Sequence, residues 1–384
     1  MSNKELRELL RKGPKYRERR AVDWTQVVKG IEETIDGVVL QWSAREGAER
    51  VALAAWKEVV LGLVSKKVER LEKTVGSPGS QEVLTTVEGR AALEDLLKRF
   101  VLVSADKSEN NTIVVCKRHY VQRIRAELAG VEGKAHTYRV ELEKIDVIVE
   151  EQLRRVTEFG VKYGFRVEKA QEKLATLYWT AKMHKNPNAE RFIASSSKCV
   201  TKVLSQFLSK CLKTVQTELK FLCLRKKRES KSSWSKYWIV NSSDEVVGKI
   251  KELNMKGEAS SVGSFDFSTL YTKLEHERLK AKLKWAIETA FESRAGSVLA
   301  VYKQRAKWVE KPRSETVVID AAGLVELVEF LIDNLVIVYG EQAYRQVIGI
   351  PMGTDCAPFL ANLYLFVLEY EWVSVQEQTA EGSV

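Results

Sequence analysis

The stretch Ser264-Phe-Asp-Phe-Ser-Thr-Leu-Tyr-Thr272 decides how the rest of this chain is interpreted. Phe265, Asp266 and Phe267 alternate apolar and acidic side chains, which is the pattern of a short strand with one face in a core. We therefore expect both phenylalanines to pack inward and Asp266 to lie at the strand end. A carboxylate placed in this way is a typical Mg²⁺ ligand. By itself the stretch favours a surface acid at a strand end.

Three other features carry chemistry of a related kind. Tyr271 follows Asp266 by five residues. Residues 349–358 read Gly-Ile-Pro-Met-Gly-Thr-Asp-Cys-Ala-Pro, in which glycine permits a close backbone approach and the last proline suits the first turn of a helix. Residues 182–193 begin Lys-Met-His-Lys and end Arg-Phe-Ile. Each feature also has a plainer interpretation, as a core aromatic, a loop before a core helix and solvated charges, respectively.

Taken together, these segments resemble the Penelope-like retroelement reverse transcriptases, a branch similar to telomerase. The resemblance rests on residues 265–272, 350–358 and 182–193, and residues 105–107 and 196–199 also fit it. It runs from about residue 100 to 372, so it covers most of the chain. The spacing within the motifs makes a chance match improbable.

The resemblance implies an RNA-directed DNA polymerase that joins nucleotides by two-metal chemistry. Asp266 would be the catalytic residue and would bind Mg²⁺, the expected cofactor. Tyr271 would select the sugar and Gly353 would line the template and nucleotide site. The cations that would meet the triphosphate are Arg191, Lys182 and Lys185. The implied partners are an RNA template, a DNA primer and deoxynucleoside triphosphates.

One departure from the family matters for mechanism. Family members continue beyond the helix that follows the Gly-Thr-x-Cys-Ala-Pro motif to a hairpin with two adjacent aspartates, and no Asp-Asp pair occurs in these 384 residues. We therefore expect a copy that is truncated before this motif. One carboxylate cannot hold two Mg²⁺ ions, so we expect no polymerisation by this chain alone. We also expect an unpaired apolar strand edge and marginal stability.

The composition is consistent with a nucleic-acid partner without proving it. The formal charge is +10 and the isoelectric point is near 9.1, which favours a polyanion. A cationic run with nearby Trp234, Tyr237 and Trp238 predicts contact with nucleic-acid phosphates and bases. The run consists of Arg225, Lys226, Lys227 and Arg228. A solvated run or a nuclear-import signal fits the same residues.

The remaining sequence features favour a protein of the cytosol or nucleus. Five scattered cysteines form no Cys-x-x-Cys pair, so reduced thiols are expected. The basic N-terminus is no secretory signal, and the most apolar stretch, 316–340, is interrupted by acids. We expect no transmembrane segment.

Hydrophobic periodicity predicts an α+β protein. We expect a helical N-terminal region over 1–99, with Asp23 as a cap. The resemblance implies that a fingers-like region over 100–262 and a partial palm over 263–384 follow it. Strands at 100–103 and 112–116 should flank a polar hairpin loop. Helices are expected at 118–131, 143–160 and 199–222, and from 262 the order should be strand, helix, short strands, helix, strands, helix.

Two other functions remain open at this point. The chain could be a non-catalytic nucleic-acid-binding protein derived from a retroelement, or a structural protein whose N-terminal 99 residues mediate assembly. Salt-dependent RNA binding separates these two. The sequence does not determine the oligomeric state.

Overall fold

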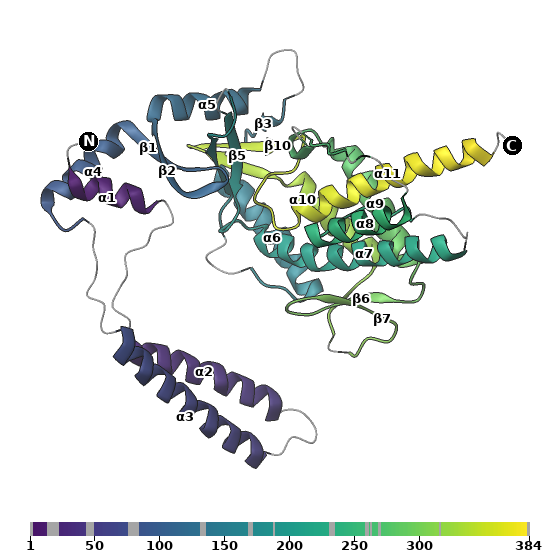
Figure 1. The fold of residues 1–384 in the computed structure, drawn as a ribbon, viewed down its shortest axis with the longest axis horizontal. Coiled ribbons are helices and arrows are strands. Elements are labelled where there is room, and N and C mark those ends of the chain that lie inside the picture. The colour runs from purple at the N-terminus through teal and green to yellow at the C-terminus, as the bar shows by residue number, and fades with distance from the viewer. Residues whose placement is uncertain are drawn as a thin grey trace. The chain divides into compact units, whose positions relative to one another are not determined.

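The computed structural model describes residues 3–13, 23–43, 50–75, 84–130, 136–167, 172–186, 189–229, 235–257, 261, 263–267, 270–314 and 316–381. Helices and strands are mixed along the chain, which confirms the α+β class (Figure 1). Residue contacts group the chain into two compact units. The first contains residues 1–117 and 181–189, and the second contains 118–180 and 190–384. The division into three regions stays a prediction.

The first unit is mainly helical. Its helices are α1 (Lys4–Lys12), α2 (Trp24–Ser43), α3 (Arg50–Val75) and α4 (Val87–Arg99). Asp23 caps α2 as expected, since its Oδ1 accepts from the amide of Gln26 at 3.1 Å. The carboxylate of Glu5 on α1 accepts from the hydroxyls of Thr85 and Thr86 at 2.6 and 2.7 Å, which joins α1 to the segment that begins α4.

The hairpin of the first unit is tighter than the sequence suggests. β1 (Phe100–Ala105) and β2 (Ser108–Cys116) are antiparallel, with Val101 opposite Val115. The predicted loop over 104–111 is therefore wrong, because only Asp106 and Lys107 form the turn. Pairing with β1 keeps the polar residues 108–111 in a strand despite their weak strand preference.

The second unit contains a sheet in the order β4-β9-β10-β3. These strands are β4 (Ala175–Lys182, whose last two residues group with the first unit), β9 (Val336–Tyr339), β10 (Gln342–Gln346) and β3 (Tyr138–Val140). β5 (Ala189–Ser195) also pairs with β4. The predicted helices at 118–131 and 143–160 are confirmed as α5 (Lys117–Ala129) and α6 (Ile145–Tyr163).

Most of the rest of the second unit is helical (Figure 1). The core is formed by α7 (Lys202–Glu229), α9 (His276–Glu292), α10 (Ala321–Asp333) and α11 (Ala357–Glu381), together with α6. The helix α8 (Ser243–Lys256) has no residue in this core. α7 buries Leu204, Leu208 and Leu212 at a spacing of four residues, so one face of this helix is entirely internal. A small sheet packs beside α7 in the order β7 (Ala306–Val309), β6 (Val298–Val301), β8 (Val318–Ile319).

The strand predicted around Asp266 is wrong. Residues 263–267 are neither helix nor strand, and the side chains of Phe265 and Phe267 are 98% and 64% exposed. A strand needs a hydrogen-bonded neighbour, and both sides of β9 are already occupied by β4 and β10. The expected unpaired strand edge is therefore replaced by an irregular segment with exposed rings. The expected marginal stability stays a prediction.

None of the helices in the described part of the chain combines the length and apolar character needed to cross a bilayer.

Candidate functional site

Residues 349–353, called the glycine loop from here on, connect the segments that the sequence singles out. The amide of Ile350 donates to the carbonyl oxygen of Tyr271 at 2.7 Å, and the amide of Gly349 donates to that of Leu274 at the same distance. Tyr271 lies in a short 3₁₀ turn, Leu270–Thr272. A Cβ on Gly349, whose φ is +86°, would lie 2.4 Å from the oxygen of Tyr271, so the close approach requires glycine.

His276, the first residue of α9, also binds the glycine loop. Its Nε2 lies 2.8 Å from the carbonyl oxygen of Gly349, and because a carbonyl only accepts, this nitrogen carries the proton. Burial lowers the pKa of the imidazole, and this effect outweighs the Gly349 bond, which acts in the opposite direction. Glu275 and Ile348 form an isolated antiparallel bridge beside it.

The other end of the glycine loop meets β5. The amide of Ala194 donates to the carbonyl oxygen of Met352 at 2.9 Å, and the Ser196 hydroxyl donates to that of Gly353. At Gly353 φ is +128°, and a Cβ there would lie 2.1 Å from the Ala194 oxygen. Gly353 is thus required by a contact within the protein. Its expected role at a template and nucleotide site stays a prediction.

Two side chains in the first turn of α7 hold the residues after the loop. Lys202 Nζ lies 2.7 Å from Oδ2 of Asp355, and the Cys356 amide donates to the Ser205 hydroxyl at 3.1 Å. Cys356 is completely buried, which raises the pKa of its thiol to about 12. Asp355 therefore forms an ion pair within the protein, and this pair is partly buried.

The environment of Tyr271 is compatible both with a core aromatic and with a residue that contacts a sugar. It packs partly against the helical core, and burial raises the pKa of its phenol. Its backbone is fixed by the glycine loop, and the side chain keeps an intermediate exposure. The ring is therefore held in place without being fully enclosed.

Asp266 is exposed on the irregular segment. Among the described residues, no group of three or more His, Cys, Asp and Glu side chains is arranged to hold a metal ion. The donor set around Asp266 thus does not fit a two-ion Mg²⁺ centre. No catalytic step is derived through a metal, and the assignment of Asp266 as a ligand stays a prediction.

The expected triphosphate cations lie on β4, on β5 and in the segment between these two paired strands. Arg191 is on β5 and is half-buried. Lys182 ends β4, and Lys185 is exposed in a turn in which its amide donates to the Lys182 oxygen at 3.2 Å. Lys182 and Lys185 group with the first unit and Arg191 with the second.

The cationic run occupies the last turn of α7 and is partly engaged inside the protein. Arg225 donates to the Ser293 hydroxyl at 2.6 Å, and Lys226 donates to the hydroxyl of Tyr370 at 3.2 Å. Lys227 is half-buried and Arg228 is exposed. Tyr237 is buried against Phe366, whereas Trp234 lies outside the described residues. The predicted interleaved aromatic surface is thus wrong at Tyr237.

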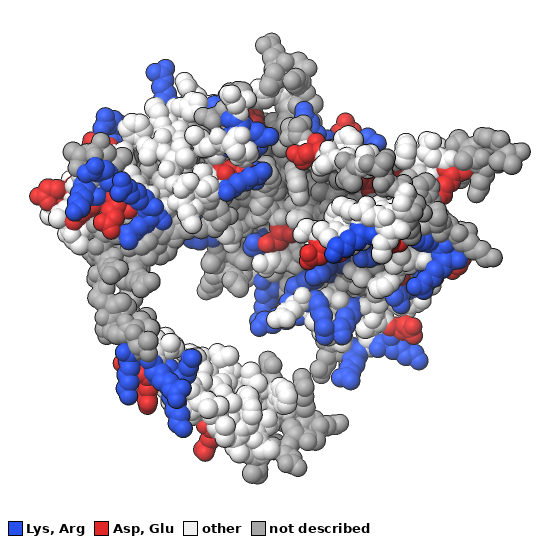
Figure 2. Space-filling model, viewed as in Figure 1, with Lys and Arg blue, Asp and Glu red and all other residues white. Residues whose placement is uncertain are grey.

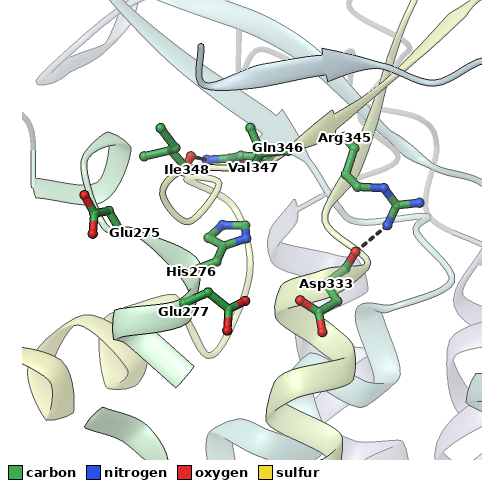
Figure 3. A pocket seen from close by; sticks show the side chains of 8 residues that line it. All are labelled: Glu275, His276, Glu277, Asp333, Arg345, Gln346, Val347 and Ile348. Atoms are coloured by element: carbon green, nitrogen blue, oxygen red, sulfur yellow. Dashed lines mark hydrogen bonds between the residues drawn. The ribbon is translucent and has the colours of Figure 1, made fainter. Parts of the chain in front are cut away.

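A hollow of about 390 Å³ lies beside the glycine loop (Figure 3). Much of its polar lining is engaged with the fold, since Arg345 donates to Glu141 at 2.5 Å and to the carbonyl oxygen of Asp333. Lys280 lies 2.9 Å from the Asp333 carboxylate. The lining residues are Glu275, His276, Glu277, Asp333, Arg345, Gln346, Val347 and Ile348.

Sequence reasoning missed three parts of this arrangement. His276 and the Lys202–Asp355 pair gave no local signal, because their partners are 73 and 153 residues away. The third part did have a local signal in the sequence. Cations occupy the odd positions from 303 to 313 except 309, and side chains two residues apart share a face wherever the chain is a strand.

Comparison with known proteins adds little to this picture. No family model and no curated protein matches the chain. Telomerase from Candida albicans, in complex with a TWJ fragment of telomeric RNA, is 11% identical with a TM-score of 0.48, over 94% of this chain and 58% of that one. Telomerase from Candida tropicalis, also with a TWJ fragment, is 10% identical with a TM-score of 0.45, over 91% and 54%.

The chain therefore spans less than two thirds of these telomerase chains, at 58% and 54% of their lengths. TM-scores of 0.48 and 0.45 are too low to carry an argument about function.

Proposed function

We propose that this chain is the nucleotide- and template-binding part of an RNA-directed DNA polymerase of the Penelope-like reverse transcriptase type. The observation that carries the proposal is the convergence of three motif segments on the glycine loop. Backbone hydrogen bonds join this loop to Tyr271 on one side and to Ala194 on the other. Segments that are about 80 and 160 residues from the loop in sequence are thus built into one site.

In this proposal Tyr271 contacts the sugar of an incoming deoxynucleoside triphosphate. Its ring suits that role because its backbone is fixed while its side chain remains partly exposed. Arg191 neutralises the triphosphate, for which the forked guanidinium is well shaped. Lys182 and Lys185 group with the first unit, and their expected contact with the triphosphate stays a prediction. Gly353 lines the site, and an RNA template with a DNA primer completes it.

We further propose that the 384-residue chain binds these partners without extending the primer. Primer extension by this chemistry would need bound Mg²⁺, and the described residues around Asp266 do not fit a two-ion centre. Asp266 is its candidate ligand, and the sequence contains no Asp-Asp pair to complete the set. Binding and catalysis are therefore separable in this chain.

The decisive experiment measures both properties on the purified chain. Primer extension on an RNA template with Mg²⁺ should give no product, whereas synthesis that is lost in Asp266→Asn would overturn the proposed inactivity. Equilibrium binding should favour dGTP over GTP. Tyr271→Ala should reduce this preference by about 10-fold, or about 1.4 kcal/mol, because the smaller side chain no longer excludes the 2′ hydroxyl of GTP. Tyr271→Phe, the matched control, should keep it.

A non-catalytic nucleic-acid-binding protein is the second candidate, and the exposed, irregular Asp266 segment favours it. The same measurements distinguish the two. RNA binding without any preference between dGTP and GTP would support the binding protein and contradict the polymerase-derived nucleotide site.

A further inference from the structure

A row of cations follows the second strand of the small sheet. Lys303, Arg305, Lys307, Lys311 and Arg313 all occupy odd positions, and they are called the basic strip from here on. Glu310 is the one acid between residues 302 and 313. The sequence thus places five positive charges against one negative charge on a short hairpin.

The fold turns the basic strip outward. The amide of Tyr302 donates to the Arg305 oxygen at 2.8 Å, which closes the turn between β6 and β7. Ala306 is buried and Trp308 packs edge-on against Phe291, with ring centroids 4.7 Å apart. Lys307 lies between these two residues on β7 and faces the opposite side, towards solvent. The other four cations lie in the segments on either side of β7, and all four are exposed.

Helix α7 adds two more cations to this surface. The Thr214 hydroxyl of α7 donates to the carbonyl oxygen of Ala306 at 3.2 Å. This hydrogen bond joins α7 to β7, which is the edge strand of the small sheet. A hollow of about 440 Å³ lies between them, and its lining includes Lys210, Lys213, Arg305 and Lys307. Within the part of the chain that the structure describes, neither these lysines nor the basic strip has an ion pair.

A second hollow has a volume of about 760 Å³. Tyr302 and Arg313 line it, and the Tyr302 side chain is 46% exposed. In Figure 2, Lys and Arg side chains gather over the region that carries α7, β6 and β7. An exposed aromatic ring therefore lies next to the basic strip and shares a hollow with Arg313.

We propose that this surface binds single-stranded nucleic acid, with its phosphates on the basic strip, Lys210 and Lys213, and a base on Tyr302. Alternate strand side chains are roughly 6.6 Å apart, inside the Debye length of about 8 Å at physiological salt, so the cations repel one another until a polyanion neutralises them. The exposed ring favours nucleic acid over an acidic peptide, because bases stack on aromatic side chains. This surface lies on elements other than the glycine loop and does not depend on the polymerase assignment.

The test is equilibrium binding of a fluorescent 12-nucleotide oligouridylate to the whole chain across a salt series, without nucleotides. The variant Lys213→Ala/Arg305→Ala/Lys307→Ala should bind about 100-fold more weakly in 0.1 M salt, and the slope of log affinity against log salt should become shallower by about 2. The matched control, Lys66→Ala/Lys67→Ala/Lys249→Ala, removes three exposed charges elsewhere and should change affinity less than about 3-fold.

Further binding measurements identify the class of ligand. Tyr302→Ala should lower the affinity for the oligouridylate and Tyr302→Phe should not, because stacking needs the ring and not the hydroxyl. A duplex of the same length should bind more weakly than the single strand. Equal affinities of the two triple-alanine variants would overturn the proposal, as would equal competition by a 12-residue polyglutamate or equal binding of the duplex. Unchanged thermal unfolding of each variant confirms that the fold is intact.

Discussion

The carbonyl oxygen of Ala194 occupies the space where the side chain of residue 353 would begin. A Cβ added to Gly353 would lie 2.1 Å from that oxygen, and the backbone φ of Gly353 is +128°. Both the contact and the conformation exclude larger residues. Gly353 therefore allows the glycine loop to pack directly against the backbone of β5.

Replacing Gly353 by alanine should destabilise the protein by about 3 kcal/mol, because the new methyl group collides with backbone that cannot move alone. Urea unfolding would measure the loss. Gly340→Ala is the matched control, since φ is +64° there and no atom lies within 4 Å. It should cost only about 1 kcal/mol of backbone strain. Equal losses for the two variants would contradict the collision.

His276 should make the fold sensitive to acid. Its pKa is lowered by burial from the ordinary value of 6.5, with Asp333, Lys280 and Glu277 contributing smaller charge effects. The unfolded chain therefore binds a proton before the folded chain does. The contribution of neutral His276 to the free energy of unfolding is fully present above pH 6.5. It is lost as the pH falls from 6.5 towards the folded pKa, and the free energy of unfolding then decreases by up to about 1.4 kcal/mol per pH unit.

His276→Gln should flatten this slope, because glutamine can donate to Gly349 without titrating in this range. Urea unfolding at a series of pH values checks the difference. His184→Gln, at an exposed histidine, is the control and should keep the wild-type slope. A slope that survives in His276→Gln would assign the acid sensitivity to another group.

The ion pair between Lys202 and Asp355 should couple α7 to the segment that follows the glycine loop. Its atoms are 2.7 Å apart, and the side chains are 19% and 31% exposed, so solvent screens the pair only in part. A double-mutant cycle with Lys202→Ala and Asp355→Ala should give a coupling energy of about 1 kcal/mol. The exposed pair Arg99–Asp95, whose side chains are 69% and 60% exposed, should give a smaller value. Additive effects at Lys202 and Asp355 would rule out the coupling.

The cysteines should differ sharply in reactivity. Cys116 is exposed, whereas Cys199, Cys211, Cys223 and Cys356 are buried. Burial raises the pKa of Cys211 to about 12 and that of Cys223 to about 11, so little reactive thiolate is present at neutral pH. Iodoacetamide at pH 8 should modify Cys116 alone in the folded protein and all five cysteines in denaturant. Rapid modification of a second cysteine without denaturant would indicate local opening.

Much of the secondary structure follows from local pattern. The helices at 118–131, 143–160 and 199–222 were predictable because their apolar residues recur every three to four positions, and their buried faces appear where that spacing places them. The cap at Asp23 was predictable for a similar reason, since it depends on residues three apart. Sequence also gave the motif segments and the resemblance that they carry.

Other features depended on partners far away in the sequence. Phe265-Asp-Phe267 has a strand pattern, yet the positions beside β9 are filled by β4 and β10, so the segment stays irregular and exposed. Residues 108–111 look like a loop, yet β1 holds them in a strand.

By itself, the sequence determined the α+β class, most helices and the motif residues, because these depend on neighbours within a few positions. Only the tertiary structure decided that Tyr271, Ala194 and Gly353 meet at one loop, that Asp355 pairs with Lys202, and that the basic strip faces outward beside α7. Hydrogen bonds and charges act over a few ångströms of space, and the packing of the core sets which distant residues come within that range.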